Sequence, residues 1–324
     1  MYNQVQLKEI IEKAVSGLSY NNDAERLTDP VKYVLSIGGK RLRPVITLMA
    51  CNLFSDTVDE AVMPAAGIEV FHNFTLVHDD IMDNAPLRRS VPTVHNKWNL
   101  NQAVLSGDVM AFIANDCFLQ APAKSMTEVF RIYNKAAIEV CVGQQLDMDF
   151  EKAAAVTQPD YLRMIMLKTA ALLAASARIG AVIGGAGERD SEFLYEFGLN
   201  LGVAFQLQDD LLDIYGDVNV FGKIVGGDII ANKKTFLFVK AMEIAAWKQQ
   251  SRLHELFTMK NVEPHAKVKE VMKIYEELNV KNATEVMVKD YVGKAFRYLE
   301  KTSVSAERKR ELTQLANTMI GRER

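Results

Sequence analysis

The chain has 324 residues, of which 49% are hydrophobic and 24% charged, and its net charge is -3. These values are ordinary for a soluble globular protein and give no reason to expect nucleic acid or an acidic membrane surface as a partner. Three cysteines without metal-ligand spacing predict buried thiols, and the first residues carry no secretory signal, so we expect a cytoplasmic protein.

Helical periodicity recurs along the whole chain, and glycine and proline together are scarcer than average. The periodicity predicts helices over 5–15, 30–37, 44–54, 61–83, 101–119, 129–149, 161–183, 191–215 and 235–249, and near 264–278, 282–300 and 304–319. The second of these is predicted to open at Asp29-Pro30, because a capping residue before proline is typical of a helix start. Residues 86–92 and 216–234 are predicted to be loops. No strand rhythm or linker is visible, so we predict an all-α fold with a single domain over 1–324 and ten or more long helices.

Residues 170–187 are almost wholly apolar and could be mistaken for a membrane span. Arg178 interrupts the stretch, and its many alanines and glycines suit a helix that is packed closely on all sides. We therefore expect a buried helix and no membrane span.

Two segments share the form DDxxD: Asp79, Asp80 and Asp83, and then Asp209, Asp210 and Asp213. On a helix, the first and last aspartates of each segment lie on one face, one turn apart. Six carboxylates in apolar runs are costly without partners, and oxygen-only ligands suit Mg²⁺. For the first cluster, the alternative of a helix end in solvent conflicts with the helix dipole. The pair predicts a metal-dependent enzyme that acts on diphosphates.

Cations follow both clusters or precede a helix start. They are Lys40, Arg41 and Arg43 after the glycine pair at 38–39, Arg88 and Arg89 after the first cluster, Lys168 within an apolar helix, and Lys223, Lys233 and Lys234 after the second cluster. Lysine and arginine beside a helix N-terminus form an anion site, although a solvated basic loop is an equal alternative for 38–44. A buried lysine normally has an anionic partner. Metals and cations together could hold two diphosphates.

Polar residues also interrupt other apolar helices. His72 lies seven residues before Asp79 and on nearly the same helix face. It is either a site residue or a hydrogen-bonded histidine of the core. Gln144, Asp147 and Gln206 need partners inside helices, which a polar site lining would supply.

With these residues in hand, the chain closely resembles the trans-isoprenyl diphosphate synthases of the polyprenyl synthetase family. The matching stretches are GGKRLRP at 38–44, HNFTLVHDDIMD at 72–83, LRRSVPTVH at 87–95, GQQLDMDF at 143–150, KTA at 168–170, FQLQDDLLD at 205–213 and FGKIVGGDIIANKKT at 221–235. Two departures are visible: Ser90 stands where the family usually has glycine after the paired arginine, and Asn232 stands where bacterial members often have glycine. The region after about residue 250 adds little to the resemblance.

The resemblance implies the isoprenoid synthase fold, with long helices around a deep central cavity, and a homodimer. It implies head-to-tail condensation of isopentenyl diphosphate with an allylic diphosphate (dimethylallyl, geranyl or farnesyl) and release of pyrophosphate. It also implies Mg²⁺ as cofactor, three ions per active site, with Mn²⁺ as a substitute.

The resemblance further assigns roles residue by residue. Asp79, Asp83 and Asp209 would bind the metal, supported by Asp80, Asp210 and Asp213. Arg88, Lys168, Lys223 and Lys233 would hold the allylic diphosphate, and Lys40, Arg43, His72 and Arg89 the isopentenyl diphosphate. Thr169 and Gln206 would face the developing carbocation, and Gln144 and Asp147 would line the substrate site.

Product length is expected to depend on Phe74, five residues before the first cluster, and next on Phe71. Helix geometry alone does not direct Phe74 into a cavity. The family pattern of an aromatic residue here implies a short-chain product, C20 geranylgeranyl diphosphate or, second, C15 farnesyl diphosphate. The alternatives are a longer-chain synthase, a terpene cyclase, which would need only one diphosphate site, and a non-catalytic subunit of a heteromeric synthase, which would lack the Asp clusters.

Overall fold

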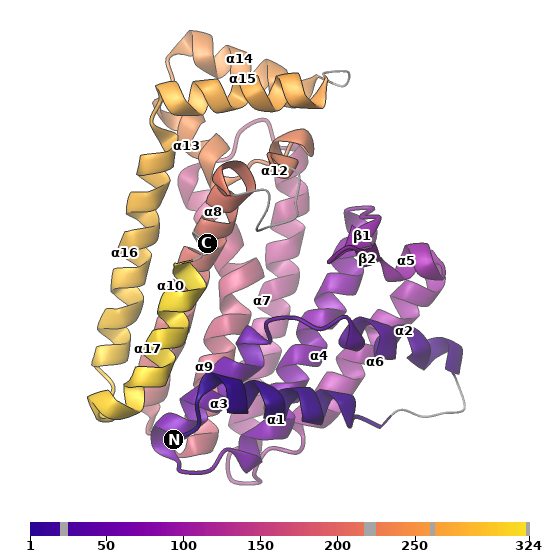
Figure 1. Ribbon diagram of the computed structural model, residues 1–324, viewed down its shortest axis with the longest axis vertical. Coiled ribbons are helices and arrows are strands. Elements are labelled where there is room, and N and C mark those ends of the chain that lie inside the picture. The colour runs from indigo at the N-terminus through magenta and orange to yellow at the C-terminus, as the bar shows by residue number, and fades with distance from the viewer. Residues whose placement is uncertain (20–24, 217–224, 260–262, 322–324) are drawn as a thin grey trace. The chain divides into compact units, whose positions relative to one another are not determined.

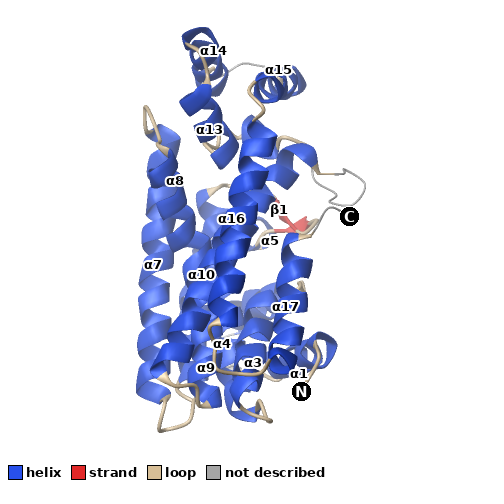
Figure 2. Ribbon diagram, turned by 90° about the vertical axis from the view of Figure 1, so that its left-hand side faces the viewer, coloured by secondary structure: helices blue, strands red, loops and turns tan. Residues whose placement is uncertain are grey.

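The computed structural model describes residues 1–19, 25–216, 225–259 and 263–321. Helices account for nearly all of its regular structure (Figure 2), which confirms the all-α prediction. Two compact units divide the chain: unit 1 comprises 1–135, 175–195 and 302–312, and unit 2 comprises 136–174, 196–301 and 313–324. The prediction of one domain around a central cavity stays a prediction.

Unit 1 contains the first Asp cluster. Its elements are α1 (Gln4–Ser16), α2 (Glu25–Ser36), α3 (Leu42–Phe54), α4 (Asp59–Met82), β1 (Leu87–Arg88), β2 (Val91–Pro92), α5 (Val94–Lys97) and α6 (Leu100–Phe118). The helices α4 and α6 pack side by side within this unit (Figure 1), and α4 also contacts α1, α2 and α3. The long apolar helix that was predicted over 61–83 is therefore the central helix of unit 1.

Unit 2 contains the second Asp cluster. Its elements are α8 (Gln158–Ile165), the π-helix η2 (Met166–Ala170), α12 (Gly227–Ile230), α13 (Phe236–Ile244), α14 (Trp247–Thr258), α15 (Pro264–Glu277) and α16 (Val280–Glu300). Four more helices contribute residues to both units: α7 (Met126–Lys152), α9 (Ala171–Gly184), α10 (Glu188–Tyr215) and α17 (Ala306–Ile320).

The predicted start of the second helix at Asp29-Pro30 was wrong, because α2 begins at Glu25 and Pro30 lies inside it. Proline has no backbone N–H and leaves a carbonyl one turn earlier without its usual donor. Side chains of α6 supply donors to two carbonyls of that turn: Gln102 bonds to the carbonyl of Arg26, and Ser106 bonds to that of Leu27 at 3.0 Å. These tertiary contacts let the helix continue through proline.

Four further expectations about elements were wrong. The predicted loop over 216–234, of which 217–224 lie outside the described residues, contains the short helix α12. The loop over 86–92 contains the hairpin β1–β2. The helix over 161–183 is interrupted by η2. The helix over 235–249 breaks at Ala245 and Ala246, whose backbones are extended, and Gln249 and Gln250 then bond to backbone groups of Ala246 and Met242 around the break.

The prediction of three buried thiols holds for Cys51 and Cys117 and fails for Cys141, which is exposed on α7. The apolar run behaves as expected. Residues 158–184 are long and apolar enough to cross a membrane, but 72% of their most apolar window is buried within the protein. Such burial is typical of an interior helix.

Candidate active site

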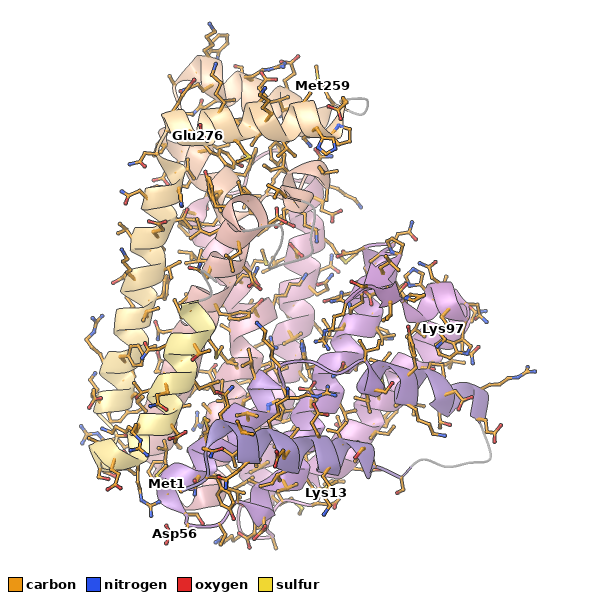
Figure 3. All side chains as sticks on the ribbon, viewed as in Figure 1. Met1, Lys13, Asp56, Lys97, Met259 and Glu276 are labelled. Carbon is orange, nitrogen blue, oxygen red and sulfur yellow. The ribbon has the colours of Figure 1, made fainter. Side chains whose placement is uncertain are left out.

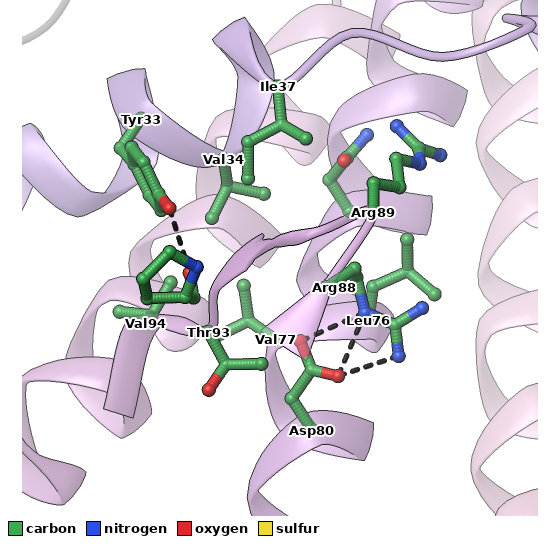
Figure 4. A pocket seen from close by; sticks show the side chains of 12 residues that line it. Tyr33, Val34, Ile37, Leu76, Val77, Asp80, Arg88, Arg89, Thr93 and Val94 are labelled. Carbon is green, nitrogen blue, oxygen red and sulfur yellow. Dashed lines mark hydrogen bonds and ion pairs between the residues drawn. The ribbon is translucent and has the colours of Figure 1, made fainter. Parts of the chain in front are cut away.

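The first Asp cluster lies in the last turn of α4, and its middle carboxylate is buried. Asp80 is 4% exposed, and both of its oxygens accept from Nε of Arg88, at 2.8 and 2.9 Å (Figure 4). A second guanidinium nitrogen of Arg88 lies 2.6 Å from Asp80. A two-pronged arginine–carboxylate contact fixes both side chains in one orientation.

The hairpin β1–β2 explains how Arg88 reaches this carboxylate. Arg89 and Ser90, at its tip, both have left-handed backbones, with φ of 51° and 65°. Two consecutive left-handed residues are typical of the tight turn that suits the twist of paired strands. Arg88 therefore pairs with Val91 across the hairpin and is held over the end of α4.

The hairpin is anchored from its other side by α2. The hydroxyl of Tyr33 donates to the carbonyl of Pro92 at 2.8 Å (Figure 4). The ammonium of Lys97 on α5, a residue labelled in Figure 3, lies 3.7 Å from the centre of the Tyr33 ring. A small recess, open to solvent, lies between these elements and is lined partly by Asp80 and Arg88.

The second Asp cluster, near the end of α10, repeats the pattern with different donors. Asp210 is 3% exposed. It accepts from the hydroxyl of Tyr161 at 2.5 Å, from Nε2 of Gln206 at 3.1 Å and from the backbone N–H of Phe236 at 3.1 Å. Burial raises the pKa of Asp210 to about 7, and burial beside this carboxylate raises the pKa of Tyr161.

In both clusters the outer carboxylates remain at least partly exposed: Asp79 and Asp83 in unit 1, and Asp209 and Asp213 in unit 2. Each pair offers oxygen atoms one helical turn apart, which fits a hard cation such as Mg²⁺. Among the described residues, no three His, Cys, Asp or Glu side chains converge as a ready-made metal cluster. Each unit offers fewer than three of the predicted ligands, so this finding does not test the predicted site.

Lys168 has the anionic partner that its place in an apolar helix predicts. Its Nζ lies 2.5 Å from a carboxylate oxygen of Asp147 on α7, and both side chains are partly exposed. Lys168 belongs to η2, and a side chain at Gly143 would come within 2.3 Å of its backbone nitrogen. The close contact between α7 and η2 thus requires glycine at 143. Gln144, the next residue, is buried.

Thr169 and Gln206 also come together. The Thr169 hydroxyl donates to Oε1 of Gln206 at 3.0 Å, and the amide nitrogen of the same Gln206 donates to Asp210. The π-turn aims two consecutive residues, Lys168 and Thr169, at polar partners on α7 and α10. Such turns inside α-helices are frequent at functional sites.

The predicted isopentenyl diphosphate residues gather in unit 1. Arg43 lies 3.2 Å from Nε2 of His72, and the guanidinium of Arg89 lies so close to Gly39 that a Cβ there would approach it to 2.7 Å. Lys40 follows Gly39 and is exposed. Burial and the neighbouring arginines hold the pKa of His72 well below its usual range, so His72 is neutral near pH 7.

Arg41, counted with these cations in the sequence, has a different place. It is 3% exposed and donates to Glu69 on α4 at 2.6 Å, to Glu12 on α1 at 3.0 Å and to the carbonyl of Leu35 at 2.7 Å. It therefore ties α3 to α1 and α4. The sequence held one sign of this contact: Glu69 stands within the apolar run at 65–71, and a buried glutamate needs a cation as partner.

Lys233 and Lys223 are the last two predicted cations. Lys233 directly follows the left-handed residue Asn232 and is partly exposed. Lys223 lies outside the described residues.

The predicted product-length residues belong to an aromatic cluster of unit 1. Phe74 is partly exposed and lies 5.3 Å from Phe71 and 4.8 Å from His78, measured between ring centres. Phe71 is buried against Tyr133, which stacks on Phe118 at 3.9 Å. Beyond Phe74 the aromatic packing is thus continuous.

Comparison with known proteins identifies the family. The model of the polyprenyl synthetase family matches residues 24–276. The chain belongs to the polyprenyl synthetase family. It is 40% identical over 269 residues to a short chain isoprenyl diphosphate synthase of Methanocaldococcus jannaschii, covering 82% of each chain. It is 39% identical to a geranylfarnesyl diphosphate synthase of Natronomonas pharaonis, covering 73% of this chain and 74% of the relative.

Comparison of the fold with solved structures supports the same family. A crystal structure of a geranylgeranyl pyrophosphate synthase superposes with a TM-score of 0.93 at 39% identity and full coverage of both chains. The family resemblance and the isoprenoid synthase fold are confirmed, and this polyprenyl synthetase family member is a trans-prenyltransferase. A non-catalytic subunit is thereby set aside.

Proposed function

We propose that this enzyme condenses isopentenyl diphosphate with an allylic diphosphate to give C20 geranylgeranyl diphosphate and pyrophosphate, in the cytoplasm. The observation that carries the proposal is the repeated Asp pattern. In each cluster one carboxylate is buried and locked by neighbours, while two remain at least partly exposed on the same helix face. Locked middle residues hold the outer oxygens in place for cations before substrate arrives.

Three Mg²⁺ ions would neutralise the charge that grows on the leaving diphosphate. Asp79, Asp83 and Asp209 would be the main residues that hold these ions, and Mn²⁺ could replace Mg²⁺. Arg88, Lys168, Lys223 and Lys233 would bind the same diphosphate and orient it. Lys168 also offsets the charge of Asp147, which keeps the ammonium in a fixed position. Asp80, Asp210 and Asp213 support the metal ligands.

Arg43 and His72, with Lys40 and Arg89, would hold isopentenyl diphosphate. Diphosphate binding would offset the mutual repulsion of Lys40, Arg43 and Arg89. Burial, together with Arg43 and Arg89, already depresses the pKa of His72. Oxygen atoms of Thr169 and Gln206 would face the carbocation, and Gln144 would line the site. The described polar groups include no evident base, and the departing pyrophosphate can accept the proton lost after the double bond attacks.

One assay tests the reaction. Purified full-length protein receives labelled isopentenyl diphosphate, Mg²⁺ and one of three primers, dimethylallyl, geranyl or farnesyl diphosphate, and chromatography gives the product length. We expect a C20 product, no turnover in EDTA, and recovery with Mg²⁺. Asp79→Ala and Asp209→Ala should each lower kcat by orders of magnitude while circular dichroism stays unchanged. Undiminished turnover in EDTA would refute the metal role.

We also propose a homodimer formed through α6. One face of this helix packs on α4, but the opposite face leaves Leu105 and Phe112 exposed. Leu119, the exposed residue directly after the helix, continues the interval of seven residues. Apolar residues at this spacing line one side of a helix and favour a helix partner. Phe112 is 68% exposed, which is costly in a monomer.

Light scattering on a sizing column tests the dimer. Phe112→Asp should convert a dimer of about twice the chain mass to a monomer, because it places charges in the centre of the interface. Trp247→Asp is the matched control, since Trp247 is 80% exposed on α14 in unit 2. A monomeric wild-type protein, or dimer loss with Trp247→Asp alone, would contradict the α6 interface.

A further inference from the structure

Lys267 on α15 is a buried lysine that follows, in the sequence, every stretch that carried the family resemblance. It is 4% exposed, and its Nζ donates to the carbonyl of Ile229 and to Oδ1 of Asn232, both at 2.5 Å. Both acceptors are uncharged, and burial lowers the pKa of Lys267. Burying a lysine without a carboxylate partner is costly, and here two hydrogen bonds and the ring of Phe257, whose centre lies 4.8 Å from Nζ, compensate the ammonium.

Lys267 holds one particular turn of the chain. We call residues 226–235 the α12 segment. Asn232 has a left-handed backbone, with φ of 60°, and is the residue directly before Lys233. Lys267 bonds to the side chain of Asn232 and to the carbonyl three residues earlier, so it closes this turn from outside. Asparagine tolerates the left-handed backbone better than most residues, and here its side chain is also fixed.

The residue on the other side of Lys233 is anchored as well. Nζ of Lys234 donates to the carbonyls of Phe150, Glu151 and Ala153, at 2.5, 3.1 and 2.9 Å. These carbonyls lie at the C-terminal end of α7, where helix carbonyls have no partner of their own and attract cations. Lys233 is therefore held between two residues whose side chains are tied to other helices.

The same segment is bonded to the second Asp cluster. The backbone N–H of Gly226 donates to the carbonyl of Asp213 at 2.8 Å, and that of Asp228 donates to its carboxylate at 3.1 Å. Beyond the segment, the N–H of Phe236 donates to Asp210. Lys267 thus belongs to a set of contacts that fixes the α12 segment relative to the second Asp cluster.

We propose that Lys267 is a positioning residue for the allylic diphosphate. By closing the turn at Asn232, it holds Lys233 in a fixed orientation beside the second Asp cluster. The inference rests on the proposed condensation, in which Lys233 binds the allylic diphosphate. A purely structural lysine would change stability and leave the balance between the two substrates untouched.

The experiment measures steady-state kinetics of the full-length enzyme with saturating Mg²⁺. Lys267→Met removes the charge and the donors but keeps an unbranched chain. Loss of a hydrogen bond that positions a ligand group costs roughly three- to tenfold in affinity. We expect the KM for the allylic diphosphate to rise about tenfold and the KM for isopentenyl diphosphate to change less than about twofold. Lys269→Met, at an exposed lysine of the same helix, should leave both KM values unchanged.

A pair of variants at Asn232 keeps the test decisive if Lys267→Met fails to fold. Asn232→Gly retains the left-handed backbone and loses the acceptor, so the allylic KM should rise about threefold. Asn232→Asp keeps an acceptor and should give nearly wild-type kinetics. In the double variant of Lys267→Met and Asn232→Gly, the rise should equal that of Lys267→Met alone.

The outcomes separate two failures. An inactive wild-type enzyme would remove the proposed function itself. An active wild-type enzyme whose folded Lys267 variant keeps its allylic KM, or shows equal rises for both substrates, overturns the positioning role. Equal allylic KM values for the glycine and aspartate variants at 232 would overturn it too.

Discussion

The buried contact between Arg41 and Glu69 makes a sharp prediction about stability. Both side chains are almost fully buried and their charged atoms lie 2.6 Å apart. Arg41→Met would leave the carboxylate of Glu69 with a neutral donor, the amide nitrogen of Asn73, which donates to it at 3.0 Å. Removing one partner of a buried ion pair typically costs about 3–5 kcal/mol, because a desolvated charge remains.

The size of the loss in unfolding free energy depends on which charges stay buried. Glu12, the other acidic partner of Arg41, is 41% exposed, so water can solvate it after the substitution. The loss therefore comes mainly from Glu69. Unfolding entropy of about 2.1 cal/mol/K per residue makes each kcal/mol worth roughly 1.5 °C of Tm in a 324-residue chain. We therefore expect Tm to fall by about 4–8 °C for Arg41→Met. Methionine and arginine have the same left-handed backbone strain at this position, so backbone strain should not contribute.

A rescue variant separates charge from packing. Combining Arg41→Met with Glu69→Gln removes the stranded charge and keeps an oxygen for Asn73. We expect urea denaturation to show that the double variant recovers at least half of the lost free energy of unfolding. Lys281→Met, which breaks an exposed pair with Glu285 at 3.9 Å, is the control and should cost about 0.5 kcal/mol or less. A double variant no more stable than Arg41→Met alone would refute the buried-charge explanation.

Further predictions concern the site and its supports. Tyr161→Phe removes a donor to a buried carboxylate and should lower the free energy of unfolding by about 1.5–3 kcal/mol in urea denaturation, whereas no change would mean that the contact is not made. Arg43→Ala or His72→Ala should raise the KM for isopentenyl diphosphate in steady-state kinetics; a rise confined to the allylic KM would reverse the assignment of the two pockets. Phe74→Ala should lengthen the product by one or more C5 units by chromatography, and unchanged length in a folded variant would leave Phe71 as the next candidate. Ser90→Gly removes the strain of a serine in the left-handed region, so it should raise the free energy of unfolding by up to about 1 kcal/mol and Tm slightly. A lower Tm would argue against the hairpin turn.

Periodicity and composition predicted most helices to within a few residues, because their apolar faces recur at the helical interval. What escaped prediction depends on distant partners. The helix α2 runs through Pro30 since α6 side chains bond to the carbonyls that proline affects. The break at Ala245 and Ala246 has no glycine or proline to signal it. Each of these features is stabilised by residues several positions or a whole helix away.

The site shows the same limit at the level of single charges. The clusters and their cations were visible as residue types, but sequence cannot tell which cation will be buried. Arg41 and Arg43 are two residues apart, yet Arg41 is enclosed by Glu69, 28 positions later, and Arg43 lies beside His72. The contribution of Lys267 was invisible because its acceptors are a backbone carbonyl and an asparagine.

The two Asp clusters differ in how their buried carboxylate is compensated, and this difference has a consequence for metal binding. Asp80 is met by the charged guanidinium of Arg88, whereas Asp210 is met by the neutral hydroxyl, amide and backbone N–H of Tyr161, Gln206 and Phe236. Neutral donors stabilise a carboxylate less than a cation does, which accords with the pKa of Asp210 near 7. A divalent cation bound at Asp209 would supply the missing positive charge and favour the ionised form of Asp210. We therefore expect a metal ion at the second cluster to supply the positive charge that Asp210 lacks. In the first cluster, Arg88 already supplies that charge to Asp80.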